Sequence, residues 1–224
     1  MNEFKHPGNY VPPYLPEFFV WWDTIERQDL ELLEEQIASA KNERDMQTFL
    51  ETNPQFLIQH FGGGRGRWVL PQGSLGSEYR TDFIVGDKNS FGHEWEVVEL
   101  ESTKARAFTK AGNPTSQLTH AIRQITDWRA WLKRNQNYAA RSRAEQGLGL
   151  VDIDANVRGL VLIGRESAVD PSTSDLRRQM VQDLKITIHT YDWLIRMARG
   201  RVEALERVRR VGLFPSFHLP AKKK

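Results

Sequence analysis

The sequence predicts an α/β fold, in which helices cover a β-sheet. Three short apolar stretches that alternate like strands follow a helical region, and from residue 115 onward helical and strand-like stretches take turns along the chain. Residues 157–164 are almost all apolar, which is typical of a central strand buried on both faces. Residues 86–90 carry turn-forming side chains between two strands and predict a hairpin. The expected order is helix, three strands, helix, strand, helix, strand and helix.

The start of the chain is expected to form an arm and a helix. Residues 1–17 contain four prolines, which favour an extended arm. Residues 16–41 carry large apolar side chains at helical spacing, beginning with Phe18, Trp22 and Ile25, and they predict a helix. This helix either caps the domain or contacts a second subunit, and the sequence leaves both interpretations open.

The remaining elements follow from apolar periodicity and from the residues that interrupt it. Met46, Phe49 and Leu50 share one stripe of a second helix over residues 42–57, which Pro54 helps to end. Strands are expected at residues 67–71, 78–85, 93–101, 157–164 and 186–190. Further helices are expected at residues 115–132, 170–184 and 191–211, with a loop over 102–114 and irregular structure or a short helix over 136–152.

Composition indicates a globular protein with one domain of ordinary size. The chain has 224 residues, of which 39% are hydrophobic, and seven tryptophans, which suffice for a core. There is no cysteine, so disulfides and thiolate metal sites are excluded. The first residues lack the apolar run of a signal peptide, and no run approaches transmembrane length. A cytoplasmic protein without a membrane partner is therefore expected.

Basic residues are unevenly distributed, although the net charge is only +2. They crowd the end of the chain, where they form either a nucleic-acid contact or a solvated helix face and tail. These residues are Arg196, Arg199, Arg201, Arg207, Arg209, Arg210 and Lys222–Lys224. The glycine-rich loop 62–67 adds Arg65 and Arg67 as candidates for touching a phosphate backbone. Because this loop lacks the Lys and hydroxyl ending of a P-loop, a nucleotide-binding P-loop protein is disfavoured.

Three carboxylates on two neighbouring strands are the most informative feature of the sequence. Asp82 lies on the predicted strand 78–85, and Glu99 and Glu101 occupy alternate positions of the next strand, so these two glutamates share one face. Carboxylates among apolar neighbours lower stability unless a cation compensates their charge. Mg²⁺ needs only one or two carboxylates and then binds waters and phosphate oxygens. The pattern predicts metal-assisted phosphodiester cleavage. In the alternative interpretation, Asp82 is a turn residue and the glutamates form the solvated face of an edge strand.

The same residues resemble the acidic motif of the PD-(D/E)XK nuclease superfamily. Asp82 and Glu99 match its two acidic positions, whereas Glu101 stands where the usual Lys is found. The resemblance implies a restriction-endonuclease-like mixed sheet flanked by helices, here with an N-terminal helical extension. It divides the chain into an N-terminal arm and helix (1–41), a nuclease-like domain (42–211) and a basic C-terminal tail (212–224).

A longer set of motifs is similar to the Shedu anti-phage defence proteins, in their SduA C-terminal or DUF4263 domain. The motif Gln124-Ile125-Thr126-Asp127-Trp128 also resembles the Gln-x-x-x-Tyr motif of RecB-like nucleases, with Trp in place of Tyr. The stretches that carry the Shedu resemblance are residues 49–54, 98–102, 108–110, 118–128 and 190–194. Together they span roughly residues 43–200 and imply the nuclease domain of a bacterial phage-defence protein, often in a homo-oligomer.

The resemblance implies roles for individual residues. Asp82, Glu99 and Glu101 would bind Mg²⁺ or Mn²⁺, and Gln124 would hold a metal-bound water or a phosphate. Glu101 cannot supply the positive charge of the usual Lys, although it can bind metal or accept a proton from water. The accessory candidates, for which a plain structural or surface role is equally open, are Glu43, Lys104, His120 and Gln117. The candidates for contacting nucleic acid are Arg65, Arg67, Arg106 and Lys110.

The sequence leaves two functions of different classes open. The first is a Mg²⁺-dependent endonuclease that cleaves DNA in bacterial anti-phage defence. The second is a catalytically silent module of the same fold that binds nucleic acid or a protein partner as a sensor or scaffold. The acidic residues separate the two, because a silent module has no reason to hold three carboxylates together.

Overall fold

A five-stranded mixed sheet forms the centre of the protein in a computed structural model, which describes residues 14–62, 66–71, 74–75 and 79–210. The strand order is β1-β4-β5-β6-β7, in which the first three strands are antiparallel neighbours and the last three are parallel. The strands are β1 (Gly66–Pro71), β4 (Phe83–Asn89), β5 (Gly92–Leu100), β6 (Arg158–Leu162) and β7 (Ile186–His189). A separate ribbon pairs β2 (Ser74–Leu75) with β3 (Tyr79–Arg80).

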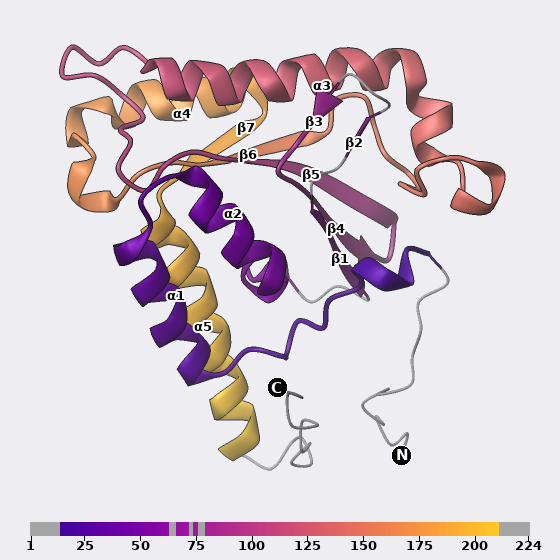
Figure 1. Ribbon diagram of the computed structural model, residues 1–224, viewed down its shortest axis with the longest axis horizontal. Coiled ribbons are helices and arrows are strands. Elements are labelled where there is room, and N and C mark those ends of the chain that lie inside the picture. Colours follow the sequence, from indigo (N-terminus) through magenta and orange to yellow (C-terminus); the bar gives the residue numbers. More distant parts are fainter. Residues whose placement is uncertain (1–13, 63–65, 72–73, 76–78, 211–224) are drawn as a thin grey trace.

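Helices cover both faces of the sheet (Figure 1). One face carries α1 (Arg27–Ser39), α2 (Glu43–Thr52) and α5 (Tyr191–Arg210), and α1 lies beside α5. The other face carries α3 (Ser116–Ala140) and α4 (Ser174–Leu184). Short 3₁₀ turns are η1 (Pro16–Phe18), η2 (Pro54–Ile58), η3 (Arg143–Glu145), η4 (Glu166–Ala168) and η5 (Pro171–Thr173). The predicted α/β class is confirmed, and the arrangement is consistent with a restriction-endonuclease-like fold. No helix in the described ranges is both long and apolar enough to cross a bilayer.

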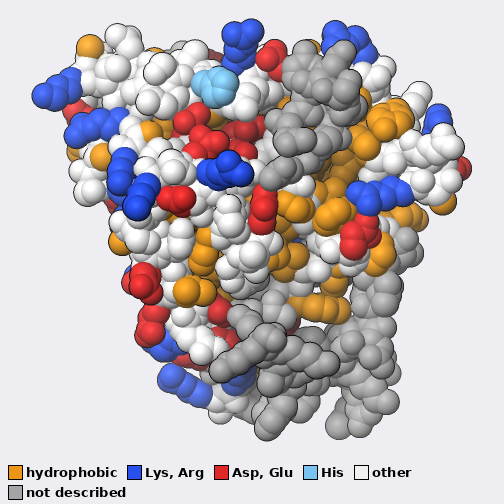
Figure 2. Space-filling view, viewed as in Figure 1, with side chains coloured by type: hydrophobic (Ala, Val, Ile, Leu, Met, Phe, Trp, Pro, Cys, Tyr) orange, Lys and Arg blue, Asp and Glu red, His pale blue; other side chains and the backbone are white. Residues whose placement is uncertain are grey.

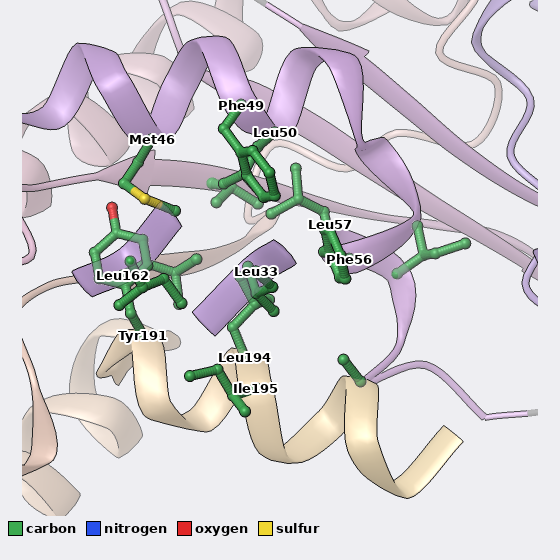
Figure 3. Close-up of a cluster of buried hydrophobic side chains, with 14 of the residues drawn as sticks. Leu33, Met46, Phe49, Leu50, Phe56, Leu57, Leu162, Tyr191, Leu194 and Ile195 are labelled. Atoms are coloured by element: carbon green, nitrogen blue, oxygen red, sulfur yellow. The ribbon is translucent and has the colours of Figure 1, made fainter. Parts of the chain in front are cut away.

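The alternation of side chains along β5 builds one hydrophobic core on each face of the sheet. Val98 and Leu100 belong to the core with α1, α2 and α5, whereas Val97 belongs to the core with α3. Figure 3 shows part of the first core, in which side chains of α1, α2 and η2 meet Tyr191, Leu194 and Ile195 of α5. These cores hold the carboxyl end of β5, and the acidic residues there, in a fixed position.

The predicted helix over residues 16–41 is wrong in its first part. Between residues 14 and 26, where the structure describes the chain, only η1 is helical, and Phe19 forms a β-bridge with Trp68 of β1. Phe18 and Phe19 pack against the core beneath α3, while Ile25 belongs to the core on the opposite face. Their helical spacing therefore reflects a segment that wraps from one face of the sheet to the other.

Two other boundaries differ from the prediction. The third helix continues to Ala140 rather than residue 132, with non-helical backbone angles at Asn135 inside it. The single strand predicted over residues 78–85 is divided, because β3 ends at Arg80 and β4 begins at Phe83. Asp82 therefore lies at the entrance to β4, which places its carboxylate at one end of the sheet.

Candidate active site

Asp82 and Glu99 face each other where β4 begins and β5 ends. Phe83 is paired with Val98 in the antiparallel register, so Asp82 stands opposite Glu99 on the next rung. The two carboxyl groups are hydrogen-bonded to each other. The Oδ2 atom of Asp82 also accepts a hydrogen bond of 2.8 Å from the backbone N–H of Leu100. This bond fixes the Asp82 carboxylate against the end of β5.

Burial makes the Glu99 carboxyl group unusual. Its side chain is 1% exposed, and burial followed by the charge of Asp82 raises its pKa to about 9. Burial also raises the pKa of Asp82. Without a cation, Glu99 therefore holds a proton at neutral pH. The Oε1 atom of Glu99 is buried and has no hydrogen-bond partner among the described residues.

Further acidic side chains surround this pair. Burial raises the pKa of Glu101 to about 7, with added effects of the charges on Glu43 and Asp82. The pKa of Glu43, in the first turn of α2, is likewise raised to about 7 by burial and by Asp82. Glu51, also on α2, raises the pKa of Asp82. Figure 2 shows acidic side chains gathered on this face between α2 and α3, with Lys and Arg side chains around them.

The donor set fits a divalent cation held by two carboxylates rather than by three. Within the described part of the chain, no group of three or more His, Asp and Glu side chains is placed to hold a metal ion together. Asp82 and Glu99 do form a direct pair, and the buried Oε1 atom of Glu99 lacks a donor. Since Mg²⁺ needs only one or two carboxylates and completes its shell with water and phosphate oxygens, this pair suits it. Glu101 lies close enough to interact through its charge.

Three of the predicted site residues lie on α3, outside the buried stripe of this helix. The buried stripe of this helix runs through Leu118, Ala121, Ile125 and Trp128. Gln117 and His120 are exposed and Gln124 is half-buried, and no hydrogen bond within the described ranges joins any of them to the acidic residues. A role of Gln117, His120 and Gln124 in the site therefore stays a prediction.

The predicted basic residues separate into two groups. Lys104, Arg106 and Lys110 are exposed on the loop that follows β5. Arg67 is 1% exposed, and its Nε atom lies 3.4 Å from Oδ1 of Asp87. The expectation that Arg67 touches a phosphate backbone does not fit this placement, because its guanidinium is inside the protein. Arg65 lies outside the described residues.

Several arginines of α5 also serve the fold. Arg199 pairs with Glu34 of α1, and the guanidinium of Arg201 donates a hydrogen bond of 2.9 Å to the carbonyl oxygen of Phe61. The same guanidinium lies over the ring of Trp22, 5.0 Å from its centroid. These arginines connect α5 to neighbouring elements.

Two supporting residues were not predicted. The buried Tyr191 hydroxyl donates a hydrogen bond of 2.9 Å to the carbonyl oxygen of Glu101, and its backbone N–H bonds Gly164. Thr81 donates to the carbonyl oxygen of Val98. Tyr191 therefore connects the start of α5 to the acidic end of β5. The only signal for it was its position directly after a predicted strand in a motif shared with the Shedu proteins.

Comparison with known proteins identifies the family. The family model for the C-terminal part of the Shedu protein SduA matches residues 40–195, which is well over half of the chain. The match begins just before α2 and ends in α5, so it includes every strand of the sheet and all of the acidic residues described above. No curated protein matches the chain. On the strength of the family match, the chain belongs to the family of the Shedu protein SduA C-terminal domain.

Proposed function

We propose that this protein is a Mg²⁺-dependent endonuclease that cleaves DNA in anti-phage defence. The Shedu family suggests the defence role. The observation that supports the chemistry is the buried Asp82–Glu99 pair, in which the Oε1 atom of Glu99 has no donor within the described residues. A buried, protonated acid pair lowers stability, and such a cost is typical of a site that serves a ligand. A divalent cation at the pair would relieve it.

Each acidic residue then has a defined role. Asp82 and Glu99 would hold the ion, and the Leu100 N–H would orient Asp82. When bound, Mg²⁺ lowers the pKa of water and neutralises charge on the phosphate. Glu101, whose pKa is about 7, is suited to accept a proton from the attacking water near neutral pH. Lys104, exposed three residues later, is the nearest candidate in sequence for the positive charge that Glu101 cannot supply.

Cleavage of linear and circular DNA tests this proposal. The purified protein is incubated with each DNA in Mg²⁺, Mn²⁺ or chelator, together with the variants Asp82→Asn and Glu99→Gln. Glu94→Gln is the matched control, because Glu94 lies on the same strand but is exposed and bonded to Asn89. We expect metal-dependent cleavage by the wild type and the control, and none by the other two. Full activity of Glu99→Gln would refute the assignment.

Two observations favour the silent-module function, which would give a distinct result in the same assay. Glu101 replaces the usual Lys, and no three-acid metal group lies within the described ranges. A silent module would bind DNA equally well with and without chelator and would cleave neither substrate under any metal condition. That result in the same assay would replace the nuclease proposal with a binding role.

A further inference from the structure

A pocket of about 180 Å³ lies at the carboxyl ends of β6 and β7, and the loop that follows Glu101 supplies part of its wall. Its walls come from the loop after β5, the turns before α4 and the start of α5. The carbonyl oxygen of Ser102 accepts hydrogen bonds from the N–H groups of Ala105 and Gly164, at 3.0 and 3.1 Å. Gly164 has a φ of +67°, and a Cβ there would collide with the Ala105 carbonyl oxygen. These contacts hold residues 102–105, which form part of the pocket wall, against the end of β6.

The lining of the pocket carries an excess of positive charge. Its charged residues are Arg106, Arg165, Arg177, Arg196, Glu166 and Asp170. Glu166 pairs with Arg196, whereas Asp170 accepts hydrogen bonds from the neutral N–H and hydroxyl of Ser172, which leave its negative charge in place. Arg165 pairs with Asp192 at 2.9 Å. The lining therefore has more cations than anions.

Arg177 is the cation of the lining with no acid assigned to it, whereas the charge of Arg106 also acts on Asp170. Neither is in an ion pair within the part of the chain that the structure describes, and Arg106 is exposed on the loop after β5. Arg177 is half-buried, and its Nη1 atom donates a hydrogen bond of 3.2 Å to the carbonyl oxygen of Ile188. This bond anchors the guanidinium on β7 and leaves its remaining N–H groups for a ligand. A guanidinium with a fixed plane is suited to bidentate contact with phosphate.

The rest of the pocket offers surfaces for the other parts of a nucleotide. His189 stacks on Trp193 with ring centroids 4.1 Å apart and an interplanar angle of 2°. Burial, followed by the charge of Arg177, lowers the pKa of His189 to about 4, so this ring is neutral at physiological pH. Phe108 and Ile163 add apolar wall. Helix α4 begins at the pocket, which places the positive end of its dipole there.

We propose that this pocket binds a phosphate group of a nucleotide, with Arg177 and Arg106 as the phosphate-binding residues. The phosphate belongs either to a free nucleotide or to a nucleic-acid strand that extends from the acidic site. The second source rests on the proposed nuclease function, whereas the first does not. The charge excess, the anchored Arg177 and the aromatic pair support a nucleotide rather than a purely apolar ligand.

Binding measurements with Arg177→Gln test the proposal. The probes are inorganic phosphate, a 5′-mononucleotide and a short fluorescent single-stranded DNA, all at one ionic strength and in chelator, so that cleavage plays no part. Arg178→Gln is the matched control, because Arg178 is the next residue of α4, pairs with Asp175 and has a 68% exposed side chain. We expect about tenfold weaker binding with Arg177→Gln, as for loss of a charged hydrogen-bond donor, and wild-type affinity with the control.

The probes distinguish the two sources of phosphate. Loss of mononucleotide binding in Arg177→Gln identifies a free nucleotide, whereas loss confined to the DNA probe identifies a strand phosphate. Arg106→Gln changes an exposed residue and provides the test if Arg177→Gln does not fold, as judged by thermal melting. Equal affinities of the pocket variants and the Arg178→Gln control for every probe would overturn the proposal. Because cleavage is not measured, failure of the nuclease proposal leaves this result intact.

Discussion

Glu99 is the residue in which the demands of folding and of function are most clearly opposed. Its neighbours on β5 are apolar side chains that fill the two cores, and its own carboxyl group is 1% exposed. A hydrophobic residue at this position would lower the free energy of the folded state, since it would remove a buried acid. Packing alone does not explain a Glu beside Asp82, and the cation that we propose for the pair would explain it.

At the residue scale, Glu99→Gln is expected to stabilise the metal-free protein at alkaline pH. The pKa of Glu99 is about 9 in the folded protein, whereas its ordinary value is 4.5. Between these values the folded state binds more protons than the unfolded chain, so the free energy of unfolding falls as the pH rises through this window. The neutral amide of Gln removes this dependence. Urea denaturation in chelator at about pH 5 and about pH 8 measures it.

The expected result is a difference that depends on pH. The variant and the wild type should have similar stability near the lower pH, which is close to the ordinary pKa of 4.5, so that little of the pH-dependent loss has yet accumulated. The variant should be more stable at the higher pH. Glu94→Gln, on the exposed part of β5, should behave as the wild type. If the free energy of unfolding changed between the two pH values by the same amount in the wild type and in Glu99→Gln, Glu99 would be ionised in the folded protein, contrary to the prediction.

At the element scale, the loop between β5 and α3 places three basic side chains, Lys104, Arg106 and Lys110, close in sequence to the acidic end of β5. A β-bridge between Phe108 and Pro114 closes it, and the Thr115 hydroxyl donates a hydrogen bond of 2.7 Å to the carbonyl oxygen of Arg106. These contacts hold the loop while Lys104 and Lys110 remain exposed. Ordered basic side chains beside an acidic site offset the repulsion of a phosphate backbone.

Neutralising this loop should reduce the salt dependence of DNA binding. The variant carries Gln at Lys104, Arg106 and Lys110, and the slope of log affinity against log salt should decrease by about 0.9 for each duplex phosphate contact that is lost. The control carries Gln at three exposed basic residues at the far end of α3 and after it, Lys133, Arg134 and Arg141. Fluorescence anisotropy over a series of salt concentrations gives the slopes. Equal slopes for the two variants would place the DNA elsewhere.

The sequence predicted those elements whose periodicity had a single interpretation. The apolar run at 157–164 and the alternation over 93–101 were placed correctly as β6 and β5, because burial on one or both faces of a sheet leaves a distinct pattern. Phe18 and Phe19 misled the prediction, since aromatic residues that pack across a sheet edge can imitate a helical stripe. The Asp82–Glu99 pairing could be expected from the hairpin. Arg67 is buried because it pairs with Asp87 on the neighbouring strand β4. Asp87 is far from Arg67 in the sequence, so spacing along the chain does not reveal this pairing.

At the scale of the whole molecule, α1 is part of the main core. Leu30, Leu33 and Ile37 lie in the same core as α5 and the sheet, and α1 contacts both α2 and α5. The exposed pair of Arg27 with Glu206 adds little stability, because surface ion pairs are weak. Burial of α1 in this core therefore connects α1 to the sheet and to α5, which support the acidic site.

Leu33→Ala should destabilise the whole protein and not only its first helix. Leu33 is fully buried, and removing such a side chain typically costs about 2–5 kcal/mol. Leu32→Ala is the control, because Leu32 precedes it on the same helix and is 44% exposed. Denaturation followed by both helix content and tryptophan fluorescence should show one shifted transition for Leu33→Ala. An unchanged transition, or loss of α1 alone, would show that this helix is separable from the domain.

Calorimetric titration with Mg²⁺ near neutral pH tests the central claim, that Asp82 and Glu99 hold a divalent cation. Because burial and Asp82 keep Glu99 protonated, binding must release a proton, and the measured heat should change between buffers of different ionisation enthalpy. We predict binding by the wild type and by Glu94→Gln, and none by Asp82→Asn or Glu99→Gln. Wild-type affinity for Mg²⁺ in Glu99→Gln, or no binding by the wild type, would contradict the claim.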